Sequence, residues 1–149
     1  MEKKTKVLFL CTGNACRSQM AEAWARHFHP DKIEAFSAGV SPSWVFPETI
    51  AVMEEAGIDM SHARSKYVEE FLGRDIDVVI SVCDHAKEVC PVFPKMTRTI
   101  HRGFDDPPML SYSNSGGDGL EQYRRVRDEI RDFISGLPEL LDGEQGEER

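Results

Sequence analysis

Residues 6–18 read KVLFLCTGNACRS, and this stretch decides the fold class. It opens with a short apolar, mostly β-forming run over residues 6–10, which predicts a strand. A glycine-containing turn follows, and then Met20, Trp24 and Phe28 recur at the i, i+4, i+8 spacing of a helix. A strand, a loop and a helix in this order form the repeating unit of a parallel α/β sheet.

The same alternation continues along the chain. Further strands are predicted at residues 33–37, 77–83 and 97–104, and further helices at residues 47–57, 67–72 and 120–137. The run DVVISVC at residues 77–83 is apolar on both faces apart from Ser81, as expected for a central parallel strand covered by helices. Residues 105–119, rich in Pro, Ser, Asn and Gly, predict a functional surface loop. We therefore expect one α/β domain over residues 1–141, with a four-stranded parallel sheet and helices on both faces, and a disordered polar tail over residues 142–149.

Composition excludes several classes of protein. The chain has 149 residues, 40% hydrophobic and 30% charged, which suits one globular domain. The formal net charge of −8 argues against a nucleic-acid surface. No apolar run approaches the length of a membrane span, so we expect a soluble, cytoplasmic protein without a membrane partner. An acidic surface without an evident apolar patch makes a monomer the default expectation.

Two of the four cysteines occupy comparable positions. Cys11 and Cys83 each follow a predicted strand directly, and the carboxyl ends of parallel strands share the edge of the sheet at which ligands bind. In a reducing cytosol, cysteines serve catalysis, metal binding or redox switching more often than structural bridges. A buried cysteine can equally be a small core residue. The neighbouring residues must decide between these two interpretations.

The neighbours of Cys11 suit an anion. Gly13 and Asn14 tolerate positive φ, which allows successive backbone N–H groups to turn inward as a nest. The following helix adds the positive end of its dipole, and Arg17 can hold two oxygens of a tetrahedral oxyanion. The Ser18 hydroxyl could donate a hydrogen bond to a Cys11 thiolate. The oxyanion-binding candidates are Thr12, Gly13, Asn14, Ala15, Cys16 and Arg17. The alternative is a plain glycine turn with an unrelated arginine.

At this point the chain resembles a known family. The motif is similar to the phosphate-binding loop of low-molecular-weight protein tyrosine phosphatases, and the resemblance extends to about residue 137. The stretches 37–39 (SAG) and 57–62 (GIDMSH) and a late Asp-Pro pair also match. The resemblance implies that Asp106, which directly precedes the proline, is a general acid. The spacing alone does not distinguish Asp105 from Asp106 as the acid.

A second pair of cysteines resembles the thioredoxin-coupled arsenate reductases that share this fold. Cys83 and Cys90 are seven positions apart. If the segment were helical, their Cα atoms would lie about 10 Å apart. A disulfide needs less than about 7 Å, so the segment would have to unwind. Pro91 disfavours a helical Cys90.

The resemblance implies a relay of three cysteines. Cys11 would attack As(V), Cys83 would attack the adduct and release arsenite, and Cys90 would resolve the Cys11–Cys83 disulfide. Thioredoxin would then reduce the Cys83–Cys90 disulfide. Arsenate is the expected ligand, with phosphate or sulfate as analogues.

Two other functions compete with reduction. A phosphatase needs only Cys11, Arg17 and the aspartate. Pro108, however, stands where an aromatic residue is expected after the Asp-Pro pair, so we favour reduction with residual phosphatase activity.

A zinc site is disfavoured because the C-x4-C and C-x6-C spacings do not match structural zinc knuckles and Arg17 would repel the cation. We expect no metal and no cofactor, and Cys16 as a packing residue with no evident chemical partner.

The resemblance also bears on potassium. Some reductases of the family hold K⁺ with residues that match Asn14, Glu22 and Ser37, together with an acidic residue whose position falls on Lys66 here. The Lys66 ammonium could replace the ion and pair with Glu22. We therefore predict that activity does not depend on potassium.

Overall fold

The structure is a computed structural model that describes residues 4–91, 93, 97–108 and 119–143. Its strands are β1 (Thr5–Cys11), β2 (Ile33–Gly39), β3 (Val78–Ser81) and β4 (Arg98–His101). Its helices are α1 (Arg17–Phe28), α2 (Pro47–Glu55), α3 (Asp84–Val89), α5 (Glu121–Ser135) and α6 (Leu137–Gly143), and a short 3-10 helix, η1 (Val68–Phe71), lies between α2 and β3. Within these ranges, none of the helices combines the length and the apolar character needed to span a bilayer.

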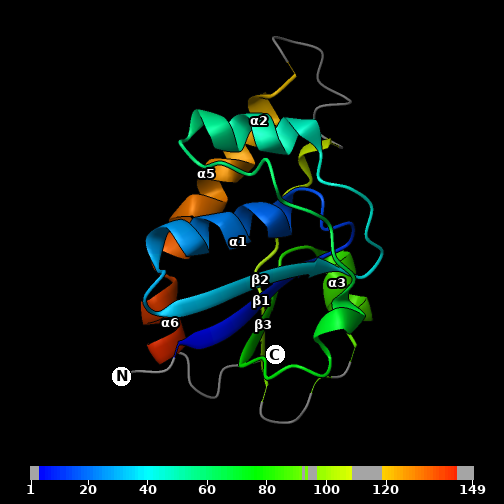
Figure 1. Cartoon of the computed structure of the whole chain (residues 1–149), viewed down its shortest axis with the longest axis vertical. Helices are drawn as coiled ribbons and strands as arrows, with labels where there is room; N and C mark the ends of the chain where they lie inside the picture. Colours follow the sequence, from blue (N-terminus) through cyan, green and yellow to red (C-terminus); the bar gives the residue numbers. More distant parts are fainter. Residues whose placement is uncertain (1–3, 92, 94–96, 109–118, 144–149) are drawn as a thin grey trace.

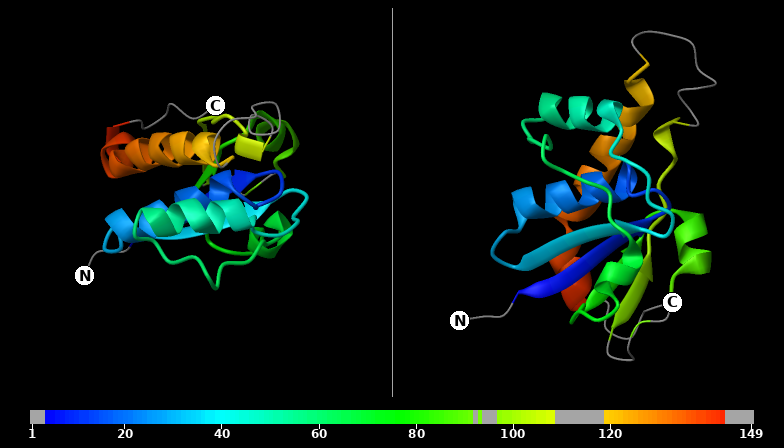
Figure 2. Two further views of the ribbon diagram at one scale, coloured as in Figure 1. Left: turned by 90° about the horizontal axis from the view of Figure 1, so that it is seen from above. Right: turned by 45° about the vertical axis from the view of Figure 1, so that its right-hand side comes forward.

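The described strands form one four-stranded parallel sheet, as predicted, in the order β2-β1-β3-β4 (Figure 1). All four residues of β3 are buried, so both faces of the sheet are covered. Phe36 and Ser37 are neighbours in β2 and therefore point to opposite faces. Glu22 of α1 accepts a hydrogen bond from Ser37 on one face, and Phe71 of η1 packs against Phe36 on the other. α5 packs alongside α1 and also contacts α2 (Figure 2).

The ends of some elements differ from the sequence prediction. β2 continues to Gly39 because its pairing with β1 extends to Cys11. The prediction of one continuous helix over residues 120–137 is wrong, because the chain forms two helices, α5 and α6, that are separated at Gly136. α6 also includes Asp142 and Gly143, so the predicted tail is wrong at these two residues. Residues 144–149 of that tail and residues 109–118 of the predicted surface loop lie outside the described residues.

The register of the sheet places the two candidate thiols at one edge. Leu10 of β1 pairs with Ser81 of β3, so Cys11 and Cys83 follow from adjacent strands. Val82 continues the ladder beyond β3, because its N–H donates to the Leu10 carbonyl at 2.9 Å. Both strands therefore deliver a cysteine to the carboxyl edge of the sheet.

Candidate active site

The loop between β1 and α1 directs its backbone N–H groups inward. Its carbonyl oxygens accept hydrogen bonds from outside the loop, since Ser41 donates to Thr12, Ser43 to Gly13 and Phe46 to Ala15. The C=O and N–H of one peptide unit point in opposite directions, so the N–H groups of Gly13, Asn14 and Cys16 face the interior of the loop. The Asn14 N–H, for example, points to Cys11 Sγ at 3.3 Å. The loop is an anion nest around the sulfur.

Two residues shape this loop. Asn14 has a φ of 51°, as the sequence predicted, and its side chain and carbonyl are held from outside the loop. Gly13, which tolerates positive φ equally well, does not adopt it, since Gly57 and Gly119 are the described glycines with positive φ. Gly39 at the end of β2 lies against the loop, and a Cβ there would stand 2.6 Å from the Thr12 carbonyl oxygen. The Gly39 position therefore allows the close approach that holds the loop.

The hydrogen bond between Ser18 and Cys11 has a defined direction. Ser18 Oγ lies 2.8 Å from Cys11 Sγ and 2.8 Å from Asn14 Nδ2. The amide nitrogen is a donor only, so the Ser18 oxygen accepts from it and directs its single proton to the sulfur. Both serine and cysteine are buried. A donor aimed at buried sulfur stabilises the thiolate, which is the nucleophilic form.

Arg17 stands between the loop and the Asp-Pro segment. Its side chain is 14% exposed, lies 3.5 Å from the Asp106 carboxylate and donates to the Phe104 carbonyl at 3.1 Å. Asp105 instead pairs with Arg125 of α5 at 3.0 Å. Asp106 therefore lies at the loop, and Asp105 lies on the α5 side. The geometry separates two aspartates that spacing alone could not.

Cys83 lies at the mouth of the same loop. Its Sγ is 3.4 Å from Thr12 Oγ1, and Thr12 is the residue after Cys11. Cys83 is also the N-cap of α3 and accepts a hydrogen bond from the Ala86 N–H at 3.4 Å. A cavity of about 650 Å³ is lined by Thr12, Arg17, Cys83 and Asp106 among others. A second cavity of about 170 Å³ adjoins Cys11 and shares Thr12, Arg17 and Asp106 with the first. The cavity at Cys83 and the cavity at Cys11 therefore share three lining residues, Thr12, Arg17 and Asp106.

The remaining cysteines differ in their surroundings. All four, which lie within the described residues, are free thiols. Cys90 lies just beyond α3 with an extended backbone, as Pro91 predicted, and partial burial raises the pKa of its thiol. Cys16 packs in the hydrophobic core, and burial raises the pKa of its thiol to about 12. Cys16 is therefore a neutral packing residue.

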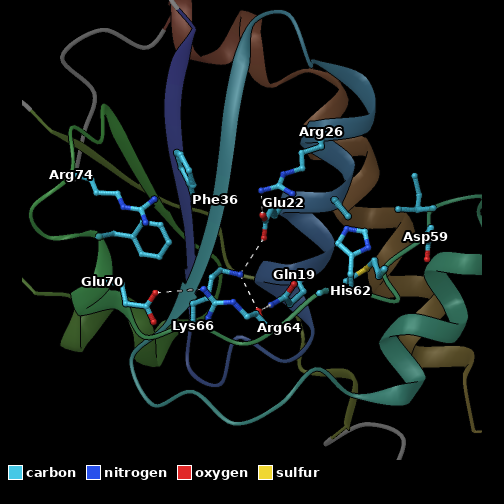
Figure 3. A pocket seen from close by; sticks show the side chains of 15 residues that line it. Gln19, Glu22, Arg26, Phe36, Asp59, His62, Arg64, Lys66, Glu70 and Arg74 are labelled. Carbon is cyan, nitrogen blue, oxygen red and sulfur yellow. Dashed lines mark hydrogen bonds and ion pairs between the residues drawn. The ribbon is translucent and has the colours of Figure 1, made fainter.

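Lys66 connects the loop to a polar cavity beneath α1. Its ammonium lies 3.8 Å from Glu22, as predicted, and donates to the Arg64 carbonyl at 3.0 Å (Figure 3). Its backbone N–H donates to the Asn14 side chain at 2.8 Å. Burial lowers the pKa of Lys66, and Glu22 acts in the opposite direction. The cavity beside this pair has a volume of about 360 Å³. A cation of the protein itself thus occupies the place beside Glu22.

Sequence reasoning missed two residues that support the loop. Gln19 donates from its side-chain amide to the Asn14 carbonyl, to the Asn14 side chain and to the Arg64 carbonyl. Ser65 donates to the Asn14 carbonyl at 2.7 Å. Gln19, Glu22 and Arg26 share a helical face, which was an available signal for Gln19. Ser65 had no comparable signal, because its partner is remote in sequence.

No metal-binding cluster is present in the described part of the chain, where no three His, Cys, Asp or Glu side chains gather closely enough. The site instead consists of a thiol inside an amide nest, a guanidinium and an acid beside it, and a second thiol at the rim. Fold and site together define an α/β protein with a cysteine nucleophile candidate in a loop suited to a tetrahedral oxyanion.

The chain belongs to the low molecular weight phosphotyrosine protein phosphatase family, whose sequence profile matches residues 6–146. It is similar to an arsenate reductase of Bacillus cereus (strain 03BB102), with 40% identity over 140 residues, which is 94% of this chain and 98% of the relative. The family resemblance inferred from the sequence is thereby confirmed.

Solved structures agree with this assignment. One, described as an arsenate reductase in the phosphate binding state, has a TM-score of 0.70 and 36% identity, and the match covers 89% of this chain and 95% of that chain. The thioredoxin-dependent arsenate reductase Cg_ArsC1' of Corynebacterium glutamicum has a TM-score of 0.70 and 27% identity, covering 97% of this chain and 65% of that chain.

Proposed function

We propose that this protein reduces arsenate to arsenite through Cys11, Cys83 and Cys90, and that thioredoxin regenerates it. The likeness to arsenate reductases supports the reaction, and one of these relatives is thioredoxin-dependent. The observation that carries the proposal is the 3.4 Å separation between Cys83 Sγ and Thr12 Oγ1. It puts a second thiol beside the loop of the first, which reduction requires and phosphate ester hydrolysis does not.

The first step joins arsenate to Cys11. The inward N–H groups of the loop and Arg17 hold the oxyanion, and its arrival competes for the guanidinium that pairs with Asp106. The Cys11 thiolate attacks arsenic, so an As–S bond forms and an As–O bond breaks. Asp106 donates the proton with which the oxygen leaves as water. Arsenic remains As(V) in this adduct.

The second step is the reduction itself. The Cys83 thiolate attacks Cys11 Sγ, so a Cys11–Cys83 disulfide forms and the As–S bond breaks. The electron pair of that bond stays on arsenic, which leaves as As(III) in arsenite. The Thr12 hydroxyl lies close enough to Cys83 to donate a hydrogen bond to its thiolate. The two thiols have supplied both electrons.

The third step moves the disulfide outward. Cys90 attacks Cys83, releases Cys11 as a thiolate and forms a Cys83–Cys90 disulfide. In the structure the six residues of α3 separate these two cysteines. The helical rise places their Cα atoms about 10 Å apart, beyond the reach of a disulfide, so α3 must unwind. A thioredoxin dithiol then reduces the Cys83–Cys90 bond and restores the enzyme.

Phosphatase activity is a second candidate. Cys11, Arg17 and Asp106 alone suffice for it, and they line one cavity together with the aromatic ring of Phe46 and with Pro108. An aromatic wall can pack against an aryl phosphate. Hydrolysis of p-nitrophenyl phosphate measures this activity separately from reduction.

Three single variants test the relay with arsenate, thioredoxin, thioredoxin reductase and NADPH. Cys11→Ser should abolish both arsenite formation and phosphate ester hydrolysis. Cys83→Ser should stop reduction while leaving any hydrolysis of p-nitrophenyl phosphate, which separates the two thiols by role. Cys90→Ser should form at most one arsenite per protein molecule. Full multiple-turnover reduction by both Cys83→Ser and Cys90→Ser would overturn the relay.

A further inference from the structure

One histidine side chain connects two strand ends with the start of α3. His101 is the last residue of β4, and its Nδ1 lies 2.8 Å from Oγ of Ser81, the last residue of β3. Its Nε2 lies 2.9 Å from Oδ1 of Asp84, the first residue of α3. Asp84 directly follows Cys83. The imidazole therefore ties the neighbour of the second thiol to the edge of the sheet.

The other neighbour of Cys83 is also held by the sheet. Val82 donates from its N–H to the Leu10 carbonyl at 2.9 Å, and its carbonyl accepts from the Phe104 N–H at 3.0 Å. Cys83 thus lies between two anchored residues, and neither anchor uses the hydrogen bonds within α3. The Ala86 N–H, in contrast, reaches Cys83 Sγ only while the first turn of α3 is formed.

The two ends of α3 differ in how they are held. Beyond its C-terminal end, Cys90 is extended, and its S–H donates to the carbonyl of the next residue, Pro91, at 3.4 Å. That hydrogen bond is local to the chain, and Cys90 otherwise packs, partly buried, against the hydrophobic core. The N-terminal end is joined through Asp84 to β4 and through His101 to β3.

We propose that His101 is a positioning residue for Cys83, acting through Asp84, which keeps this thiol beside Thr12, at the mouth of the Cys11 loop, while α3 unwinds. The inference rests on the proposed function and deepens it. During the third step, Cys90 travels to an anchored Cys83, and Cys83 does not leave the oxyanion loop to meet Cys90. The same anchor raises the effective concentration of Cys83 near Cys11 in the second step.

The contact acts through geometry more than through stability. The Asp84 side chain is 89% exposed, and an exposed pair contributes little to folding. Asp84 variants should therefore fold normally. Gly103 leaves room for the pair, since a Cβ there would lie 3.3 Å from His101 Nε2 and 3.4 Å from Asp84 Oδ1. Gly103→Ala consequently offers an independent way to disturb the contact.

The test measures the Cys11–Cys83 disulfide without arsenate or thioredoxin. The Cys90→Ser protein is equilibrated with glutathione and glutathione disulfide, which oxidises the two thiols to one disulfide and yields two glutathione molecules. Mass spectrometry of the digested protein identifies the bonded pair and its equilibrium constant. The constant is compared after adding Asp84→Ala, Asp84→Asn, Gly103→Ala or Glu88→Ala. Glu88 is an exposed acid on the same helix and controls for loss of charge.

We expect Asp84→Ala and Gly103→Ala to lower the equilibrium constant about fivefold, the effect of one hydrogen bond. Asp84→Asn, whose amide can still form a hydrogen bond with the imidazole, should keep the equilibrium constant close to that of the Cys90→Ser parent. Glu88→Ala should leave the constant unchanged. With arsenate, Asp84→Ala should lower kcat and leave KM for arsenate unchanged. Equal constants in Asp84→Ala and Glu88→Ala would overturn the positioning role alone. Failure of the Cys90→Ser parent to form the disulfide would overturn the relay as well.

Discussion

Ser18→Ala removes the hydroxyl proton that Ser18 directs at Cys11. Ser18 Oγ lies 2.8 Å from the sulfur, and its proton has no competing direction because Asn14 Nδ2 donates to the same oxygen. A hydrogen bond to a charged group contributes about 1.5–3 kcal/mol. Since 1.4 kcal/mol corresponds to a factor of ten, we expect kcat/KM for arsenate to fall about 10- to 100-fold.

The assay follows arsenite formation with thioredoxin, thioredoxin reductase and NADPH. Ser65→Ala is the matched control, because it removes a part-buried hydrogen bond of 2.7 Å to the same loop without touching the sulfur. The Asn14 carbonyl keeps its bond from Gln19 in that variant. If Ser18→Ala keeps kcat/KM within about threefold, or if Ser65→Ala loses as much, the role assigned to this hydroxyl is refuted.

Three further predictions concern Lys66, the two aspartates and Cys16. At constant ionic strength, exchanging Na⁺ for K⁺ should leave the rate of arsenate reduction unchanged, because the Lys66 ammonium, 3.8 Å from Glu22, takes the place of the ion. A clear increase in the rate with K⁺ would contradict this prediction. Asp106→Asn removes the proposed general acid and should lower the rate of arsenate reduction at least about 100-fold. Asp105→Asn loses only an exposed pair with Arg125 and should keep the rate within about threefold. Equal losses in the two variants would reject Asp106 as the acid. Burial raises the pKa of Cys16 from 9.0 to about 12, so the folded state keeps a proton that the unfolded state loses above pH 9, and stability must fall as pH rises through this range. Between pH 8 and pH 10 the loss from Cys16 should be about 1.4 kcal/mol in urea unfolding, and Cys16→Ala should lose that much less; identical losses would contradict the shift.

Much of the fold could be predicted because it depends on local patterns. The apolar run before Cys11 and the helical spacing of Met20, Trp24 and Phe28 each lie within one element, and both elements form as expected. The division at Gly136 was missed because the apolar face continues across it, and periodicity does not report a break of one residue.

The candidate site was predicted in its chemistry and less completely in its geometry. Cys11, Arg17 and Ser18 stand within eight positions, so their grouping follows from one loop and one helix turn. The expected pairing of Lys66 with Glu22 also appears in the structure. The contact of His101 with Ser81 and Asp84 was not foreseen, because it depends on the adjacency of β3 and β4.

By itself, the sequence determined which chemical groups are available and which short segments form strands and helices, since these properties depend on a residue and its near neighbours. Only the tertiary structure decided which aspartate stands beside Arg17 and that Thr12 meets Cys83, 71 positions away. The physical reason is that contacts between distant residues depend on the order and register of the strands. That order is set by the packing of the whole core, which no single stretch of sequence contains.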